Sequence, residues 1–296
     1  MSDLESRLAR AWAVRQARFP DEITWSYPLD TAVLSLTGGQ CALDCAHCGG
    51  HYLGGMRPIQ DSEPDDSTSC LISGGCELQW RVPVLAHMDQ VRAWRQGLTM
   101  NWHLGFVSEA EMESITPLVD VVSFDFVGDD ATIHEVYGID RTVDDYVDTY
   151  RLLRRHRRTL PHVTIGLRGG ALGHEIAAFE HLEALGIDGL VILVFIPTQG
   201  TRYAERQPPS LDEVAQLLVD ARLRFPDKPL FLGCMRPKGR YRDQLDLLAV
   251  QAGFNVIVSP ARPARQQAAE LGLTARKIRE CCVCLLYTSD AADDAM

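Results

Sequence analysis

Three cysteines, Cys41, Cys45 and Cys48, follow a short apolar run with the spacing C-x3-C-x2-C. Soft thiolate sulfurs this close together in a chain can hold an iron–sulfur cluster or a zinc ion. Three protein ligands leave a fourth coordination position for a ligand that is not protein, and open sites of this kind serve catalysis more often than structure. The spacing therefore predicts a reactive metal centre in the loop after residues 31–36.

The motif resembles the cluster-binding loop of the radical S-adenosylmethionine (SAM) superfamily. The resemblance implies that Cys41, Cys45 and Cys48 are the metal ligands and the catalytic centre, and that they hold a [4Fe–4S] cluster whose fourth iron binds SAM. One-electron reduction would cleave SAM to a 5′-deoxyadenosyl radical, which would abstract hydrogen from an unactivated carbon. His47 stands where the family usually has an aromatic side chain near the adenine. The alternative is a zinc knuckle closed by His47 or His51.

A glycine pair follows the next predicted strand. Ser73, Gly74 and Gly75 match the position at which the family binds the SAM ammonium group through backbone carbonyls. Cys76 replaces the usual acidic residue there, with Glu77 one step later. Glycines also make turns, so the evidence comes from the position of the pair, one strand after the cysteine motif.

Two later strand ends carry further candidate cofactor ligands. Ser123 and Asp125 close the fourth predicted strand, where the family often binds the ribose hydroxyls, and Arg168 closes the fifth. A guanidinium there would pair with the SAM carboxylate in a bidentate fork. The competing interpretation gives Asp125 a loop-capping role and Arg168 a structural ion pair. His103 is either substrate-facing or a hydrogen-bonded core histidine.

The other cysteines of interest are Cys70, Cys76, Cys234, Cys281 and Cys282. One interpretation is that they are inert core thiols, because a free cysteine packs as a small hydrophobe. The other is that some of them hold an auxiliary iron–sulfur cluster near the top of the same barrel. Such a cluster would act as a sulfur donor or an electron conduit.

Several segments resemble the biotin-synthase-like branch of the superfamily, and more narrowly its two-component, lipoyl-synthase-related members. These segments are GGQC ending at Cys41, CGGHYL from Cys48, IHEVYGIDR at 133–141, FIPTQGT at 195–201 and LGCMRP at 232–237. The resemblance implies sulfur insertion in lipoyl- or biotin-type cofactor synthesis. It implies a small-molecule or carrier-bound acyl substrate, an electron donor such as flavodoxin or ferredoxin, and a second radical SAM subunit. The C-x4-C-x5-C motif of one-chain lipoyl synthase is absent.

β-rich apolar runs alternate with helical patterns along the chain, which predicts parallel strands joined by right-handed crossovers. Strands are expected at 31–36, 69–73, 99–104, 119–126, 162–167, 190–195, 230–233 and 255–259. Helices are expected at 4–18, 88–94, 144–157, 174–185 and 211–223. Eight strands favour an α/β fold of the (β/α) TIM-barrel type, complete or nearly closed, with its chemistry at the carboxyl ends of the strands.

The 296 residues fit one large domain. Residues 1–30 are expected to form an N-terminal helix and lead-in, and residues 31–283 the radical SAM barrel. Residues 284–296 (CLLYTSDAADDAM) resemble a translated sequencing adapter, so we expect them to be non-native and Cys284 not to be a ligand.

A net charge of −11 argues against nucleic acid as a partner, because no basic surface displaces phosphate counterions. No run is long and apolar enough to span a bilayer, and the N-terminus lacks a signal-peptide core. We therefore expect a cytoplasmic protein without a membrane partner, in which nine cysteines serve metal or redox chemistry.

Two rival functions remain from the sequence. One is a single-cluster radical SAM enzyme that carries out a rearrangement, an epimerisation or C–C bond formation. The other is a non-catalytic metal-binding subunit that carries zinc or an electron-transfer cluster.

Overall fold

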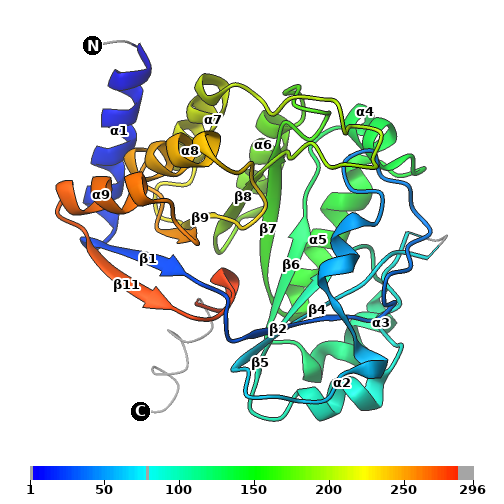
Figure 1. The fold of residues 1–296 in the computed structure, drawn as a ribbon. Helices are drawn as coiled ribbons and strands as arrows, with labels where there is room; N and C mark the ends of the chain where they lie inside the picture. The colour runs from blue at the N-terminus through cyan, green and yellow to red at the C-terminus, as the bar shows by residue number, and fades with distance from the viewer. Residues whose placement is uncertain (1–2, 78–79, 286–296) are drawn as a thin grey trace.

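The structure is a computed structural model that describes residues 3–77 and 80–285. A curved sheet of parallel strands has helices along its outer side (Figure 1). The strands are β1 (Glu22–Ser26), β2 (Thr31–Ser35), β3 (Arg57–Pro58), β4 (Ser69–Ser73), β5 (Thr99–Leu104), β6 (Val121–Asp125), β7 (Arg158–Ile165), β8 (Leu190–Val194), β9 (Leu230–Leu232), β10 (Val256–Val258) and β11 (Thr274–Ile278).

The helices are α1 (Asp3–Arg18), α2 (Met88–Trp94), α3 (Glu109–Ile115), α4 (Asp130–Thr132), α5 (Val143–His156), α6 (Glu175–Leu185), α7 (Leu211–Arg224), α8 (Arg240–Gln251) and α9 (Arg262–Glu270). The 3-10 turns are η1 (His51–Gly55), η2 (Ile59–Asp61), η3 (Thr116–Leu118) and η5 (Cys282–Cys284), and η4 (Ile133–Tyr137) is a π-helical turn. No helix of the described residues is long and apolar enough to cross a membrane.

The side chains along each strand enter two apolar environments in turn, because successive side chains point to opposite faces of a sheet. On β5, Met100 and Trp102 belong to the large core beneath the helices. Asn101 and His103, which alternate with them along the strand, therefore face the concave side of the sheet. The smaller core, on that concave side, is made by Val121, Leu160, Val191, Leu193, Phe231, Val256 and Val258 together with Cys282, Val283 and Cys284.

The described strands form one eleven-stranded parallel sheet in the order β11-β1-β10-β9-β8-β7-β6-β5-β4-β2-β3. The expectation of a closed or nearly closed barrel is thus wrong: the sheet is open, and β11 and β3 are its ends. The physical reason is that β10 and β11 take both hydrogen-bonding edges of β1. Neither edge of β1 remains for β2, and β3 is only two residues long.

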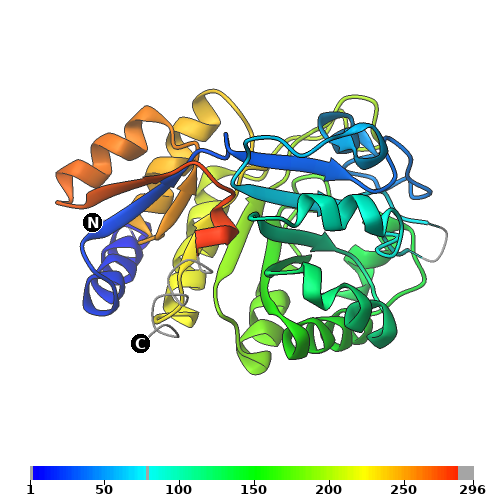
Figure 2. The same cartoon turned by 90° about the horizontal axis from the view of Figure 1, so that it is seen from below.

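The chain after β11 turns back into the curve of the sheet. Arg279 forms an ion pair with Asp30 at 2.6 Å, just before β2, and the amide of Cys281 donates to Thr31 Oγ1 at 2.8 Å. Turn η5 then contacts β5, β6 and β10 on the concave side, where Figure 2 shows it in red. This segment partly fills the opening that the strands leave.

The predicted strands at 69–73 and 99–104 coincide with β4 and β5, and the predicted helix at 88–94 coincides with α2. The prediction missed β1, which lies inside the expected lead-in and joins the main sheet, and it missed the edge strands β3 and β11. Strand β11 has an almost wholly exposed sequence, TARKI, so no apolar periodicity marked it.

Candidate metal centre at the carboxyl ends of the strands

The three cysteines of the motif lie in one loop beyond the carboxyl end of β2, which we call the cysteine loop (residues 41–50). Cys45 is buried, whereas Cys41 and Cys48 are half-buried. A hydrogen bond with the Cys45 thiol lowers the pKa of Cys48 to about 7, against the effect of burial. The same bond, together with burial, raises the pKa of Cys45. Of these two hydrogen-bonded thiols Cys48 is thus the one that ionises more readily, and the thiolate is the form that binds metal.

The glycine pair after β4 packs directly against this loop. A Cβ atom on Gly75 would lie 2.0 Å from the carbonyl oxygen of Gln40 and 2.7 Å from the Cα of Cys41, so only glycine fits. The amide of Gly75 donates to Thr37 Oγ1 at 2.7 Å, and the amide of Cys76 donates to Cys41 Sγ at 3.3 Å. This hydrogen bond ties Cys41 to the end of β4, so the strand end helps to fix the position of the Cys41 sulfur.

His47 lies between Cys45 and Cys48, and its ring packs edge-on against Tyr137 at 5.5 Å between centroids. Its Nδ1 is buried and has no hydrogen-bond partner among the described residues. Burial lowers the pKa of His47 to about 4, so the ring is neutral at pH 7. A buried polar atom without a partner is rare in folded proteins, and this one lies in the loop where the resemblance expects a cofactor contact.

Asp125, at the end of β6, lies beside two histidines from the neighbouring strands. His103 Nε2 on β5 is 3.3 Å from Asp125 Oδ2, and the ring of His162 on β7 stacks on the ring of His103 at 5.3 Å. His162 Nδ1 contacts the carbonyl oxygen of Leu160 at 3.1 Å. A carbonyl only accepts, so Nδ1 carries the proton and Nε2 is left as the acceptor.

The charges in this group support one another. The surrounding protein partly desolvates both groups and favours their neutral forms, although the Asp125 side chain is 48% exposed on the concave side. The charge of Asp125 and its hydrogen bond nevertheless raise the pKa of His103. His103 in turn holds the pKa of Asp125 at about 2. Burial and the neighbouring His103 lower the pKa of His162 to about 4. His162 was not predicted from the sequence, because its place in an apolar strand leaves no local signal.

An Asp125→Asn variant should lower the pKa of His103, because desolvation then acts without the opposing carboxylate. NMR titration of the imidazole signals measures this, with Asp188→Asn near α6 as the control. The raised pKa of His103 stabilises the wild type below about pH 6.5, and this contribution disappears as pH rises through the folded-state pKa. The lowered pKa of Asp125 stabilises it above about pH 3.8, and this contribution disappears as pH falls towards 2. An unchanged His103 titration in the variant would contradict the pairing.

Three other candidate cofactor ligands already have protein partners. Ser123 is buried and its hydroxyl donates to Asn101 Oδ1 at 3.0 Å. Arg168 lies three residues beyond β7 and its Nε donates to Glu135 Oε2 at 2.8 Å, which is the structural ion pair of the competing interpretation. The Ser73 hydroxyl donates to the carbonyl oxygen of His103 at 3.0 Å. At the end of β4 the backbone, and not the Ser73 hydroxyl, therefore remains to interact with the cysteine loop.

The remaining cysteines separate into three places. Cys70 is fully buried in the core beneath the helices, on the face of β4 opposite the concave side. Cys76 adjoins Cys41 through its amide. Cys234, Cys281 and Cys282 lie on the concave side, where the thiol of Cys282 lowers the pKa of Cys281 and Asn101 Nδ2 approaches Cys281 Sγ at 3.8 Å.

The expected adapter-like tail begins inside the described part of the chain. Cys284 is buried against the concave side, and residues 286–296 lie outside the described residues.

No three His, Cys, Asp or Glu side chains converge tightly enough to hold a metal ion within residues 3–77 and 80–285. This result concerns a single ion, whereas a four-iron cluster takes one thiolate per iron and spreads its ligands more widely. Three thiols of one loop, one of them with a lowered pKa, are a donor set suited to such a cluster.

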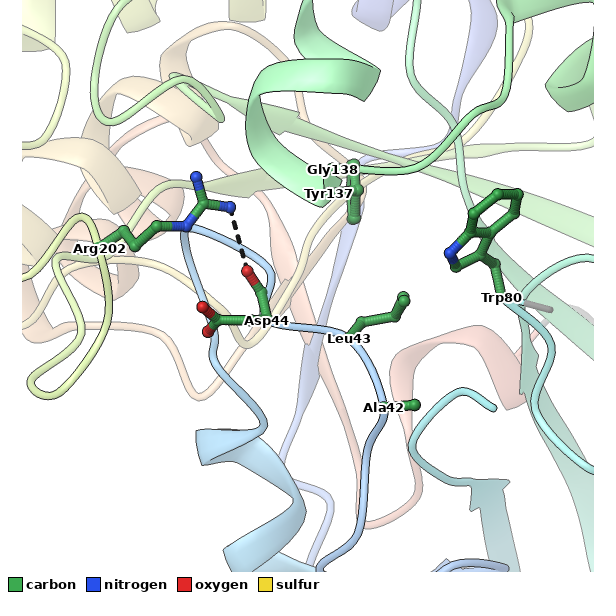
Figure 3. A pocket seen from close by; sticks show the side chains of 7 residues that line it. All are labelled: Ala42, Leu43, Asp44, Trp80, Tyr137, Gly138 and Arg202. Carbon is green, nitrogen blue, oxygen red and sulfur yellow. Dashed lines mark hydrogen bonds between the residues drawn. The ribbon is translucent and has the colours of Figure 1, made fainter. Parts of the chain in front are cut away.

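A pocket opens on the outer side of the cysteine loop. It has a volume of about 360 Å³ and is lined by Ala42, Leu43, Asp44, Trp80, Tyr137, Gly138 and Arg202. Figure 3 shows Arg202 and Trp80 on opposite sides of the loop residues, with the Arg202 guanidinium bonded to the carbonyl oxygen of Asp44. The pocket gives the loop a solvent-facing side close to its cysteines.

Comparison with solved structures defines the class of fold: an open, parallel α/β barrel. One match is methylornithine synthase (PylB), with a TM-score of 0.68 and 14% identity over 93% of this chain and 90% of that one. Another is the FeFe-hydrogenase maturase HydG from Carboxydothermus hydrogenoformans, with a TM-score of 0.67 and 11% identity over 95% and 75%.

The HMG-CoA lyase from Brucella melitensis also matches, with a TM-score of 0.51 and 12% identity over 93% of this chain and 100% of that one. No family model matches the chain, and no curated protein matches it. At these identities the likeness shows the fold, and the argument for function depends on the residues of the site.

Proposed function

We propose that this chain is a radical SAM enzyme in which Cys41, Cys45 and Cys48 hold a [4Fe–4S] cluster. One observation carries the proposal: the glycine pair of β4 packs against Cys41 so closely that a Cβ on Gly75 would overlap the loop backbone. The resemblance links the cysteine motif and the glycine pair. They are neighbours in space, because Cys76 contacts Cys41 although the two are 35 residues apart in the chain. They stand at the carboxyl ends of parallel strands, where such folds place their chemistry.

When bound, the cluster would supply the electron that cleaves the sulfonium of SAM to a deoxyadenosyl radical. The residues of this chain bind and orient. The backbone at Ser73–Gly75 offers carbonyl oxygens to the SAM ammonium group, the neutral ring of His47 offers Nδ1 and a flat face to the adenine, and Asp125 offers a half-exposed carboxylate to the ribose. Arg168 would have to exchange Glu135 for the SAM carboxylate.

The finer proposal is hydrogen abstraction followed by sulfur insertion, as in lipoyl- or biotin-type cofactor synthesis. Its support is the group of Cys234, Cys281 and Cys282 on the concave side, next to His103 and His162. These thiols are the remaining candidates for an auxiliary cluster, because Cys70 faces the opposite core and Cys76 adjoins Cys41 of the cysteine loop. A small-molecule or carrier-bound acyl substrate, a flavodoxin- or ferredoxin-type electron donor, a second radical SAM subunit and a cytoplasmic location belong to the same proposal.

Iron and sulfide analysis of anaerobically reconstituted protein tests the auxiliary cluster. We expect a Cys41/Cys45/Cys48→Ala triple variant to retain iron, and to lose it when Cys281 and Cys282 are also replaced by alanine. As the matched control, Cys70→Ala is added to the triple variant in place of the Cys281 and Cys282 replacements. This control should leave the retained iron unchanged. A triple variant without iron, beside a wild type with about four irons, would contradict sulfur insertion.

The second candidate is a single-cluster radical SAM enzyme that carries out a rearrangement, an epimerisation or C–C bond formation. The observation that favours it is the separation of Cys70 from the concave-side cysteines by the sheet itself. Turnover that is insensitive to loss of Cys234, Cys281 and Cys282 would select this candidate.

A further inference from the structure

The segment after β8, residues 198–203, lies along the cysteine loop and the turn η1 that follows it, and it contacts both. At one end the hydroxyl groups of Thr198 and Tyr52 are 2.9 Å apart. At the other end the amide of Tyr203 donates to the carbonyl oxygen of Ala46 at 3.0 Å. Thr201 also lies close to Gly49, because a Cβ atom built on that glycine would be 3.5 Å from Thr201 Cγ2. We call residues 198–203 the clamp.

Arg202 is the side chain of the clamp that joins the loop to a third segment. Its Nη2 donates to the carbonyl oxygen of Asp44 at 3.0 Å and to that of Val136 at 3.3 Å. Its Nη1 donates to the carbonyl oxygen of Glu135 at 3.4 Å. One guanidinium therefore serves carbonyls of both the cysteine loop and the π-helical turn η4 (Figure 3), and a planar, five-donor group is suited to this in a way that lysine is not.

The π-helical turn is itself held against the loop and the clamp. The amide of Ala46 donates to the carbonyl oxygen of Val136 at 2.7 Å. The Tyr203 hydroxyl donates to Glu135 Oε1 at 2.7 Å, and Arg168 takes the other carboxylate oxygen of Glu135. Turns of the π type are rare and occur often at functional sites, and this one presents two carbonyls to the same arginine.

These contacts converge on the residues on either side of Cys45, the most buried thiol of the motif. We propose that Arg202 is a positioning residue: it fixes the Asp44–Ala46 backbone against η4 and thereby sets the place of Cys45 relative to Cys48. The inference depends on the proposed function only for the identity of the group that the cysteine loop binds. A metal site needs its ligands fixed within about 0.5 Å, and a loop rich in glycine after Cys48 would not supply this by itself.

Hydrogen exchange of the metal-free protein tests the proposal without any cofactor. Arg202→Gln removes the charge and the fork, Arg202→Lys keeps the charge only, and Arg240→Gln at the exposed start of α8 is the matched control. We expect Arg202→Gln to speed exchange in residues 44–52 about tenfold, which corresponds to about 1.4 kcal/mol, with β4 to β7 unchanged. Arg202→Lys should restore little of the protection, and Arg240→Gln should match the wild type. Unchanged loop exchange, or acceleration spread over the whole sheet, would overturn the proposal.

Low-temperature EPR of the reconstituted, reduced variants gives a second readout. Arg202→Gln should broaden or shift the cluster signal and lower iron retention, whereas Arg240→Gln should not; a signal identical to the wild type would contradict positioning. The two hypotheses fail separately. A wild type that binds no iron contradicts the proposed function and leaves the hydrogen-exchange result standing, whereas normal loop exchange in Arg202→Gln contradicts only the role of Arg202.

Discussion

A Cys45→Ala variant is expected to retain almost no iron after reconstitution and to form no 5′-deoxyadenosine from SAM. Cys45 is the buried member of the motif, and its loss leaves two thiols for a cluster that needs three protein ligands in this loop. The variant also loses the hydrogen bond that lowers the pKa of Cys48, so Cys48 becomes a poorer ligand at neutral pH. Iron and sulfide content and the visible spectrum measure the first effect, and chromatography of the SAM products measures the second.

Cys70→Ala is the matched control for this experiment. Cys70 is as deeply buried as Cys45, yet it packs in the core beneath the helices, and burial raises its pKa to about 12. The control should keep both its iron and its SAM cleavage. Deoxyadenosine formation at the wild-type level in Cys45→Ala would show that the motif is not the reactive centre.

A Gly75→Ala variant is expected to lose iron and SAM binding while the sheet still folds. The added Cβ would meet the carbonyl oxygen of Gln40 at 2.0 Å and the Cα of Cys41 at 2.7 Å. Both are backbone atoms, so the cysteine loop must move away from β4, and overpacking of this kind costs about 1–3 kcal/mol. The movement would break the Cys76–Cys41 hydrogen bond. Thermal unfolding measures the cost, and iron content with equilibrium SAM binding measures the effect on the site.

Gly39→Ala is the control for the glycine variant. A Cβ on Gly39, two residues before Cys41, would meet nothing within 4 Å. This variant should keep the iron content and SAM affinity of the wild type. Gly75→Ala with unchanged iron and SAM binding would mean that the contact between β4 and the loop does not support the site.

The sequence predicted the parts of the fold that have a local signature. The strands β4 and β5 and the helix α2 follow from apolar runs and helical periodicity, and they coincide with the predicted ranges. The closed barrel could not be excluded from sequence, because closure depends on which strand takes each edge of β1, and residues far apart in the chain decide this.

The sequence predicted the candidate ligands of the site but not the residues that surround them. The motif identified Cys41, Cys45 and Cys48, and the glycine pair was found by its position one strand later. Partners contributed by distant strands and loops have no local pattern: His162 stacks on His103 across two strands, and Arg202 reaches Asp44 from 158 residues away in the chain. The face of the sheet on which Cys70 lies could not be predicted either, because glycines at a strand end make the alternation of side chains unreliable.

Product analysis of the wild type tests most simply whether this site reduces SAM to a deoxyadenosyl radical. Anaerobically reconstituted protein is mixed with SAM, with and without a one-electron reductant, and 5′-deoxyadenosine and methionine are quantified by mass spectrometry. If the chain is a radical SAM enzyme, equal amounts of both products form, and only with reductant. A colourless, zinc-loaded protein that binds no SAM and forms neither product would contradict it.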